Sequence, residues 1–432
     1  MLDKFRTLVK GQRETLGKEQ LERLTQLQGA VWIHAASVGE FEQARPIIEK
    51  LRSQEPRAKS QQPIKVVVTF FSPSGYEARK NYELSDGVFY LPFATRRHAK
   101  QFLDALQPKM ALFVKYEFWP AYLKELHKRN IPTYSISAIF RPTQRFFHWY
   151  GATALRLLKN FTHLYVQDEA SRELLVSHGI EHCSVVGDTR FDRVVQIANA
   201  VRPSQSDCKT ANAVRPPLAE RLLPVAEFVE GCERVLVAGS TWPEDEVLLA
   251  RYIEEHEGSK LILVPHEINE DHLHSIFNQF QGRLIKYSVI SNQSSDIRHN
   301  AMRHASVLLI DTIGLLSSIY RFGQVAYIGG GFGVGIHNTI EAAVYGVPVL
   351  FGPNYRHFRE AIGLINAGAA RSIANYPELE SALDNAFAEH AEIGAKAAAY
   401  VESELGATDK IYREIFDNRQ MTVHFGLSAK RS

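Results

Sequence analysis

The chain has 432 residues, of which 45% are hydrophobic and 23% charged, and its formal net charge is +2. This length predicts two domains, and the composition is typical of a globular protein rather than a disordered or membrane-spanning one. The near-neutral charge gives no sign of a nucleic-acid partner. The three cysteines lack the spacing of a metal site or a disulfide framework, which is typical of a reducing compartment.

The N-terminal segment, residues 1–27, has a helical pattern and is basic at its start. A basic amphipathic helix of this kind can lie on an anionic membrane surface. The alternative is a solvated helix, because Glu14, Glu19 and Glu22 dilute the basic face. We expect neither a signal peptide nor a transmembrane run.

Short apolar runs then alternate with helical patterns along the chain, which predicts βαβ units and mostly parallel sheets. The predicted strands are residues 30–35, 65–70, 88–91, 110–114, 133–136, 164–166, 184–186, 234–238, 260–264, 284–286, 307–310, 325–328 and 347–351. A helix is predicted from Glu40 to Leu51, and residues 377–417 are helical in pattern.

A proline- and serine-rich stretch interrupts this alternation after residue 200. The predicted organisation is therefore an N-terminal helical segment (1–27), a first domain (28–200), a linker region (201–232), a second domain (233–405) and a C-terminal helix and tail (406–432). We expect an α/β fold of two Rossmann-like domains whose parallel sheets face each other across a cleft. Ligands of such sheets bind at the carboxyl ends of the strands.

The most informative motif follows the predicted strand 325–328, where a loop with several glycines leads into a short helix near Asn338. Backbone N–H groups at such a helix start favour an anion. His337 lies in this loop, and Glu341, one turn into the helix, could accept hydrogen bonds from sugar hydroxyls. The motif therefore indicates a nucleotide-sugar site, although Asn338 is also a good helix cap.

A second motif, His34 to Glu40, lies where the first predicted strand turns into a helix. Gly39 would let a substrate approach the backbone, and a partly buried Glu40 would be a general base. The alternative is structural, because Ser37 and Glu40 have the spacing of a capping box.

Other strand ends carry similar turns. Ser240 and Thr241 are suited to a phosphate, with a plain helix cap before Pro243 as the alternative. Pro265–His266 and Asp311–Gly314 end two further strands.

In the first half, residues 115–120 place charged side chains directly after a buried strand, where they need solvent or a partner. Arg190 could neutralise a carboxylate or phosphate, or form a surface ion pair with Asp188 or Asp192. No metal signature is present, and none of the motifs is a Walker A sequence.

Taken together, these motifs resemble those of the Kdo transferases, which move 3-deoxy-D-manno-octulosonic acid (Kdo) from CMP-Kdo to a lipid A precursor. The resemblance spans about residues 30–415. It is carried by residues 36–40, 117–120, 187–192, 311–314, 337–341 and 351–353. It implies a GT-B fold, with the acceptor in the N-terminal domain and CMP-Kdo mainly in the C-terminal domain.

The resemblance also implies an inverting glycosyl transfer without metal or cofactor, in lipopolysaccharide biosynthesis at the cytoplasmic face of the bacterial inner membrane, with peripheral membrane contact. Glu40 matches the catalytic base, Glu117 a second carboxylate that supports the transition state, and Arg190 a position where many members have Lys. The expected donor contacts are Ser37, Gly39, Ser240, Thr241, Pro265, His266, Thr312, Ile313, Gly314, Gly335, His337, Asn338, Thr339, Ile340 and Glu341.

Three features depart from the family pattern. The chain starts without the hydrophobic anchor of many members, Lys115 stands where many have Glu, and Ile336 replaces a glycine of the anion loop. Two other classes remain open: a GT-B epimerase or hydrolase acting on a UDP-sugar, and a non-catalytic nucleotide-sugar-binding or membrane-scaffold protein.

Overall fold

The computed structural model describes residues 2–53, 64–200, 217–280 and 282–417. The chain forms two compact units. The first consists of Met1–Arg193 and Glu404–Ser432, and the second of Val194–Ser403. Residues 201–216 of the expected linker, and with them Cys208, lie outside the described residues. The rest of that linker begins with helix α10 (Pro217–Val229).

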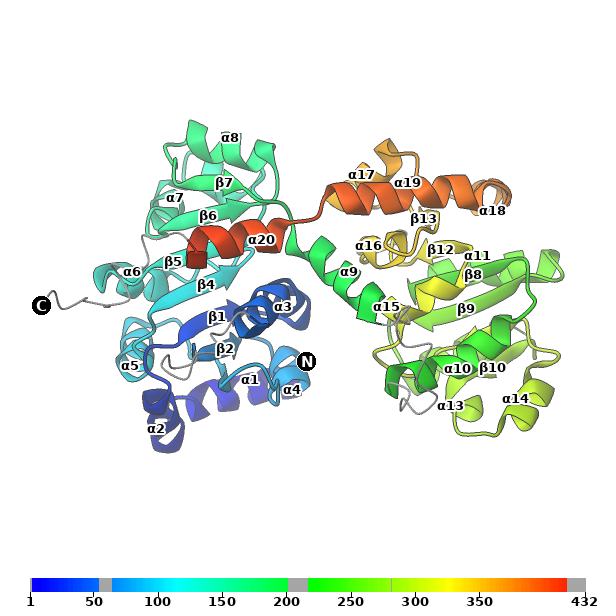
Figure 1. Ribbon diagram of the computed structural model, residues 1–432, viewed down its shortest axis with the longest axis horizontal. Coiled ribbons are helices and arrows are strands. Elements are labelled where there is room, and N and C mark those ends of the chain that lie inside the picture. The colour runs from blue at the N-terminus through cyan, green and yellow to red at the C-terminus, as the bar shows by residue number, and fades with distance from the viewer. Residues whose placement is uncertain (1, 54–63, 201–216, 281, 418–432) are drawn as a thin grey trace, which may run out of the picture. The chain divides into compact units, whose positions relative to one another are not determined.

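The first unit contains a sheet of seven parallel strands in the order β3-β2-β1-β4-β5-β6-β7 (Figure 1). The strands are β1 (Val31–Ala35), β2 (Val66–Phe70), β3 (Gly87–Tyr90), β4 (Met110–Val114), β5 (Thr133–Ala138), β6 (His163–Val166) and β7 (Cys183–Val185). The helices are α1 (Leu2–Glu14), α2 (Lys18–Gln26), α3 (Val38–Ser53), α4 (Pro73–Arg79), α5 (Arg96–Leu106), α6 (Pro120–Lys128), η1 (Arg145–Phe147), α7 (Ala152–Leu158), α8 (Glu169–Ser177), α9 (Thr189–Ala200, which crosses into the second unit), α20 (Ala407–Tyr412) and η4 (Arg413–Asp417).

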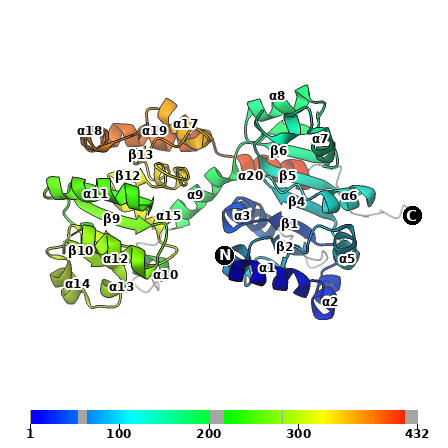
Figure 2. The same ribbon diagram turned by 180° about the vertical axis from the view of Figure 1, so that it is seen from behind.

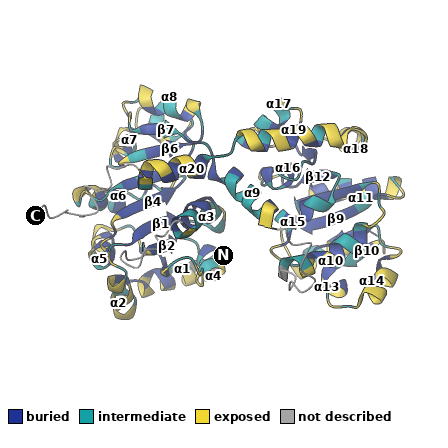
Figure 3. Ribbon diagram, in the orientation of Figure 1, coloured by how far each residue is buried: buried dark blue, intermediate teal, exposed yellow. Residues whose placement is uncertain are grey.

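Both faces of this sheet are covered by helices, which explains why its central strands are continuous apolar runs. Trp32 of β1 packs with helices α5 and α6 on one face. Val31 and Ile33 face the opposite side, where they share a cluster with α3 and with Ile411 of α20. Figure 3 shows these strands as buried and the outer sides of the helices as exposed.

The second unit also has seven parallel strands, in the order β10-β11-β9-β8-β12-β13-β14. Figure 2 shows this unit from behind. The strands are β8 (Val235–Thr241), β9 (Lys260–Pro265), β10 (Leu284–Lys286), β11 (Val307–Leu309), β12 (Val325–Ile328), β13 (Val349–Phe351) and β14 (Ala370–Ser372). Besides α10, the helices are α11 (Pro243–Glu255), α12 (Glu270–Gln279), α13 (Tyr287–Ile290), α14 (Ser295–Met302), α15 (Leu316–Ile319), η3 (Tyr320–Phe322), α16 (Ile340–Ala343), α17 (Arg359–Asn366), α18 (Tyr376–Ala388) and α19 (His390–Ser403).

The strand order of each sheet indicates where a ligand would bind. In the first sheet the strand order reverses direction between the adjacent strands β1 and β4, and in the second between β8 and β12. Crevices outside the carboxyl ends of strands at such switch points are the usual ligand sites of open α/β sheets. The predicted α/β fold with two parallel sheets is confirmed.

The C-terminal segment returns to the first unit and is anchored there by one carboxylate. Asp192 in α9 accepts hydrogen bonds from the backbone N–H groups of Gly406 (2.8 Å) and Thr408 (2.7 Å) at the start of α20. These are two of the donors that a helix start leaves without intrahelical partners. Asp192 is thus a helix cap, whereas the ion pair considered for Arg190 is formed with Asp188.

Candidate functional site

Glu40 lies in the first turn of α3, directly after β1. Its Oε2 accepts hydrogen bonds from the backbone N–H of Ala36 (2.6 Å) and of Ser37 (3.3 Å). The Glu40 N–H in turn approaches Ser37 Oγ at 3.4 Å. The capping box expected as an alternative is therefore present.

The same carboxyl group has unusual electrostatics. Burial, followed by the negative charge of Glu117, raises the pKa of Glu40 from 4.5 to about 7, although the Ala36 N–H and the Lys115 ammonium act in the opposite direction. A carboxylate of this kind exchanges protons near neutral pH, as a general base must. Gly39 beside it is exposed, and a Cβ there would meet only Ser37 Oγ at 4.0 Å, so space remains next to Glu40.

Glu117 follows β4, on the other side of the switch point. Its Oε2 accepts a hydrogen bond from Trp119 Nε1 at 2.6 Å and lies 3.2 Å from Nε2 of the fully buried His34. Thus β1 and β4 bring Glu40, Glu117 and His34 together at one edge of the first sheet. His34 belongs to the predicted motif, but a contact with Glu117 was not anticipated.

Arg190 forms a close ion pair with Asp188. Its Nε donates to Asp188 Oδ2 at 2.8 Å, its second guanidinium contact is 2.7 Å long, and Asp188 is only 1% exposed. Burial alone would raise the pKa of Asp188, but Arg190, helped by Lys115, outweighs burial and holds it below the usual value. The ion pair with Asp188, which was the alternative role for Arg190, is therefore present. It is largely buried, and it places a cation near the Lys115 side of the site.

In the second unit, Ser240 and Thr241 close β8 at the switch point. Ser240 has a backbone φ of 54°, a left-handed conformation that costs a non-glycine residue about 1–3 kcal/mol. The buried Thr241 hydroxyl donates to Glu246 Oε1 at 2.9 Å. Because the Thr241 hydroxyl already bonds Glu246, Ser240 is the remaining candidate for the hydroxyl that was expected to bind phosphate.

Three aromatic rings stack at the carboxyl ends of β8, β9 and β12. The Trp242 ring lies 4.9 Å from that of His266, which lies 4.4 Å from that of His337. Burial and the neighbouring His266 lower the pKa of His337 to about 4, so His337 is neutral at pH 7. Pro265 ends β9 and brings His266 to this stack, whose rings offer flat surfaces to an aromatic base.

The glycine loop after β12 is held mainly by contacts with itself and its neighbours. The N–H groups of Gly335 and His337 donate to the carbonyls of Gly330 and Gly329 at 3.0 and 3.3 Å. A Cβ at Gly331 would meet the backbone of Gly352 at 2.5 Å. Several of the glycines thus allow loops to approach one another closely, and Gly335 and His337 do not offer the N–H groups that were expected to bind an anion.

The predicted helix near Asn338 is shorter than expected, since α16 covers only Ile340–Ala343 after Thr339. Asn338 makes no side-chain cap. Its Nδ2 donates to Glu341 Oε1 at 2.9 Å, while its Oδ1 is buried and has no hydrogen-bond partner among the described residues. An unpartnered buried acceptor is costly, so this amide is suited to a ligand donor.

The segment after β11 is more open. Ile313 is largely exposed, Gly314 has a φ of 88°, and the Thr312 hydroxyl has no partner among the described residues. The preceding Asp311 accepts from the backbone N–H of Ser288 at 2.9 Å. The expected donor contacts of this segment are thus brought to the same edge of the second sheet.

Sequence reasoning missed Asp245, which joins two turns of the second site. Its Oδ2 accepts from the N–H groups of Trp242 and Gly330, each at 2.9 Å, and its Oδ1 from the Tyr327 hydroxyl at 2.7 Å. Burial raises its pKa despite these donors. The signal was available, because an Asp at the third position of a helix often reaches back to the cap.

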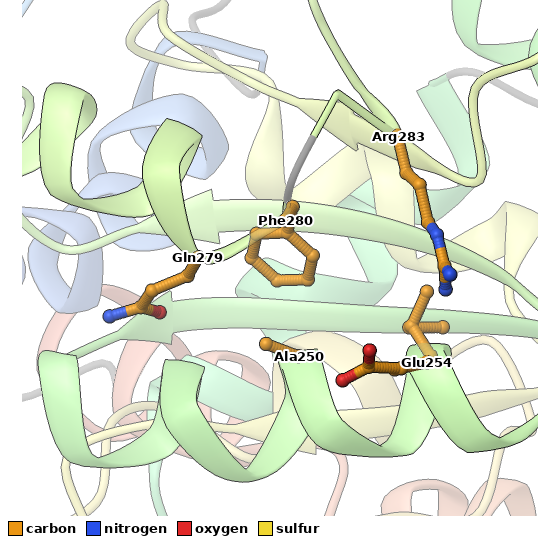
Figure 4. Close-up of a pocket in the computed structure, with 6 residues that line it drawn as sticks. Ala250, Glu254, Gln279, Phe280 and Arg283 are labelled. Carbon is orange, nitrogen blue, oxygen red and sulfur yellow. The ribbon is translucent and has the colours of Figure 1, made fainter.

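A small cavity of about 20 Å³ lies elsewhere in the second unit, lined by α11, α12 and Arg283 (Figure 4). It contains none of the predicted site residues and is large enough for about one water molecule. Among the described residues no cluster of His, Cys, Asp and Glu side chains is arranged to hold a metal. Within the same residues, no helix combines the length and hydropathy of a membrane span.

The chain is similar to several known proteins. A family model described as 3-Deoxy-D-manno-octulosonic-acid transferase (kdotransferase) matches residues 10–193. The chain is 25% identical over 371 residues to the 3-deoxy-D-manno-octulosonic acid transferase of Aquifex aeolicus, covering 84% of this chain and 87% of that protein. It is 26% identical over 397 residues to the Bordetella pertussis enzyme of the same name, covering 88% and 86%.

A bifunctional glycosyltransferase/methyltransferase of Fusobacterium nucleatum is 23% identical over 332 residues, which are 74% of this chain but only 47% of that protein. The UDP-GlcNAc 2-epimerase of Neisseria meningitidis has a similar fold, with a TM-score of 0.62 and 14% identity, covering 90% of this chain and 100% of that chain. The S. aureus MnaA–UDP structure gives 0.59 and 12%, covering 92% and 98%. The chain has the GT-B fold of these structures, and its sequence is similar to the 3-deoxy-D-manno-octulosonic acid (Kdo) transferases.

Proposed function

We propose that this chain transfers Kdo from CMP-Kdo to a lipid A precursor, with inversion at the anomeric carbon. The observation that carries the proposal is Glu40, a carboxyl group with a pKa of about 7 beside a second carboxylate, Glu117, at the switch point of the first sheet. Similarity to the Kdo transferases supports the choice of sugar and of a lipid acceptor.

In the proposed reaction, Glu40 takes the proton of the acceptor hydroxyl as its oxygen attacks the anomeric carbon of Kdo. The bond from that carbon to the phosphate oxygen breaks at the same time, and CMP leaves with the electron pair. A single displacement of this kind inverts the anomeric centre. Glu117 favours the positive charge that develops on the sugar, because the two charges have opposite signs.

The second unit would hold the donor. The Trp242–His266–His337 stack offers ring faces to the cytosine, and Asn338 with Glu341 offers an acceptor-rich group to the ribose hydroxyls. Ser240 would donate to the phosphate. We infer no metal in this step.

We further propose that the protein contacts the membrane peripherally, at the cytoplasmic face of the bacterial inner membrane, through the loop that follows η1. Phe146 of η1 is buried in the core, whereas Trp149 and Tyr150 in the following loop are 93% and 61% exposed. Beside Tyr150 is a pocket of about 460 Å³ that Lys124 and Arg145 also line. Exposed aromatic side chains with cations are suited to an anionic lipid interface.

The test is CMP release from CMP-Kdo with and without a tetra-acylated lipid A precursor, with UDP-N-acetylglucosamine as the alternative donor. We expect release only from CMP-Kdo, dependent on the acceptor, and unchanged by a chelator. Turnover of the UDP-sugar instead would identify an epimerase or hydrolase. Binding of CMP without any release would identify a non-catalytic protein, and either result would refute the proposal.

Membrane contact is tested separately with vesicles. Trp149→Ala should reduce sedimentation with phosphatidylglycerol vesicles, whereas Phe277→Ala, an exposed aromatic on α12 of the other unit, should not. Equal binding of the two variants would exclude this loop as the contact.

A further inference from the structure

Trp242, directly after β8, is not among the predicted donor contacts, but its indole ring contacts one of them, His337. Trp242 Nε1 donates a hydrogen bond to His337 Nε2 at 3.3 Å. An indole N–H can only donate, so His337 Nε2 is the acceptor of this bond and carries no proton. The one proton of the neutral imidazole is therefore on Nδ1.

The Nδ1–H group of His337 is available to a ligand. The side chain is partly exposed, and Nδ1 makes no hydrogen bond to any of the described residues. The His266 ring covers a face of the imidazole at 4.4 Å. A Cβ at Gly330 would meet its Cδ2 and Nε2 atoms at 3.2 and 3.4 Å. These contacts involve a ring face or the Nε2–Cδ2 edge, so Nδ1 is the polar atom of the ring that remains for a ligand.

The position of the indole ring is fixed by a buried carboxylate. Asp245 Oδ2 accepts hydrogen bonds from the backbone N–H groups of Trp242 and Gly330, each at 2.9 Å. One oxygen thus holds both the turn that carries Trp242 and the turn on which the His337 ring lies. Because both turns are already anchored, little conformational entropy is lost when the two rings form their hydrogen bond.

The same turns bring Ser240 close to this histidine. A Cβ at Gly329 would meet the Ser240 carbonyl oxygen at 2.3 Å, so the loop after β12 packs directly on the Ser240 turn. The Ser240 hydroxyl is the phosphate candidate of that turn, and the His337 Nδ1–H is a second donor at the same edge of the sheet. A phosphate oxygen is a suitable acceptor, and a neutral donor brings no second charge into a partly buried site.

We propose that His337 donates its Nδ1–H to a phosphate oxygen of the nucleotide donor, and that Trp242 is a positioning residue that keeps His337 in the required tautomer. This inference rests on the proposed use of CMP-Kdo. A hydrogen bond of this kind stabilises the negative charge that develops on the phosphate as CMP leaves. Burial, together with the neighbouring His266, lowers the pKa of His337 to about 4, which agrees with a ring that remains neutral.

Two substitutions of His337 test which nitrogen binds the nucleotide. His337→Asn places an amide N–H at the δ position of the side chain, whereas His337→Gln places it at the ε position. Both variants lose the stack with His266, so the stack does not affect the comparison. In calorimetry, CMP should bind His337→Gln about tenfold more weakly than His337→Asn, as expected for one hydrogen bond to a charged group. Cytidine, which lacks the phosphate, should bind both variants equally.

The matched control is His256→Asn. His256 belongs to the same unit and also stacks on an aromatic ring, that of Tyr252, at the end of α11. This substitution should leave the affinity for CMP unchanged.

Trp242→Phe tests the positioning role, because it keeps an aromatic ring but removes the indole N–H. Nitrogen NMR of histidine-labelled protein should show His337 protonated at Nδ1 alone in the wild type and also at Nε2 in the variant. The His337 signals are those that disappear in His337→Asn. Trp242→Phe should weaken CMP binding about tenfold in the wild type. In His337→Asn it should have little further effect, because residues that act through one another are not additive.

Equal CMP affinity of His337→Asn and His337→Gln, or a wild-type His337 protonated at Nε2, would overturn the inference. If cytidine affinity differed between the two variants as CMP affinity does, the acceptor would be on the base or ribose, and the assignment to the phosphate would be wrong. Failure of the proposed donor is distinct from these results, because it would appear as absence of CMP binding by the wild type itself.

Discussion

Glu40→Gln separates the two roles of this residue, because glutamine can replace glutamate in a capping box but cannot accept a proton as a base. Its carbonyl oxygen can still receive the Ala36 and Ser37 N–H groups that Glu40 Oε2 receives now. The variant should therefore fold and should bind CMP as the wild type does. Transfer should fall by more than about 100-fold, as expected for loss of a positioned general base.

The same substitution should stabilise the protein in a pH-dependent way. The folded-state pKa of Glu40 is raised from 4.5 to about 7, so stability is lost as the pH rises from the unfolded pKa through the folded one. At about 1.4 kcal/mol per pKa unit, the loss above pH 7 is about 3 kcal/mol. Glu40→Gln removes this loss of stability, because glutamine does not ionise. The gain in unfolding free energy should be largest at pH 8, smaller at pH 5 and absent at pH 4.

Two measurements test this reasoning. The first is urea unfolding at pH 5 and pH 8, followed by a signal from the first unit. The second is CMP release at pH 7.5. Glu40→Ala is the comparison, since it also lacks the cap, whose loss costs about 1 kcal/mol. Near-normal transfer by Glu40→Gln would reduce Glu40 to a helix cap. A stability gain that does not depend on pH would show that its pKa is not raised.

Three other substitutions address single contacts. Glu341→Ala should weaken CMP binding about tenfold by loss of an acceptor, and unchanged affinity by calorimetry would refute its ligand role. Arg190→Lys keeps a cation and should retain most activity, whereas Arg190→Ala leaves Asp188 charged and 1% exposed, which should destabilise the fold by about 3–5 kcal/mol in thermal unfolding. Asp192→Ala removes the cap of α20 and should speed hydrogen exchange at Gly406 and Thr408; equal exchange would contradict that anchoring role.

Much of the fold was predictable because buried parallel strands are short apolar runs with clear ends. Predicted residues 110–114, 284–286 and 325–328 match β4, β10 and β12 in full. The strand β14 was missed, since Ala370–Ser372 is a partly exposed edge strand without an apolar run. The helical pattern of residues 377–417 did not reveal its interruptions, which include Gly406 with a φ of 98°.

The positions of the site residues in the fold could be predicted from the sequence, whereas their side-chain contacts were harder to predict. Strand ends could be located from the sequence, and the topology then brings Glu40 and Glu117 to one edge of the sheet. The pairing of Thr241 with Glu246, and of Asn338 with Glu341, depends on side-chain directions that spacing alone does not determine. The units are joined through α9 and the segment after α19. The return of α20 to the first unit could not be predicted, because it is anchored by Asp192 and no distinct sequence pattern indicates that this residue caps a helix.

Backbone strain is a separate indication of where a functional site lies. Ser240 has a φ of 54° at the end of β8, in a region that glycine occupies without cost. Strain of this kind persists where the surrounding structure needs it, and it often marks ligand sites. Ser240→Gly should therefore raise the unfolding free energy by about 1 kcal/mol and, if the hydroxyl binds phosphate, weaken CMP binding about tenfold.

Gln107→Gly is the matched control. Gln107 has a φ of 40° and caps the C-terminal end of α5, where glycine is the preferred residue. Substitution there should also stabilise the protein by about 1 kcal/mol, through the same relief of strain, but should leave CMP affinity unchanged. If Ser240→Gly gained the same stability as Gln107→Gly and kept full CMP affinity, the left-handed turn at Ser240 would be a requirement of folding alone, and the phosphate would have to be held elsewhere at this edge of the sheet.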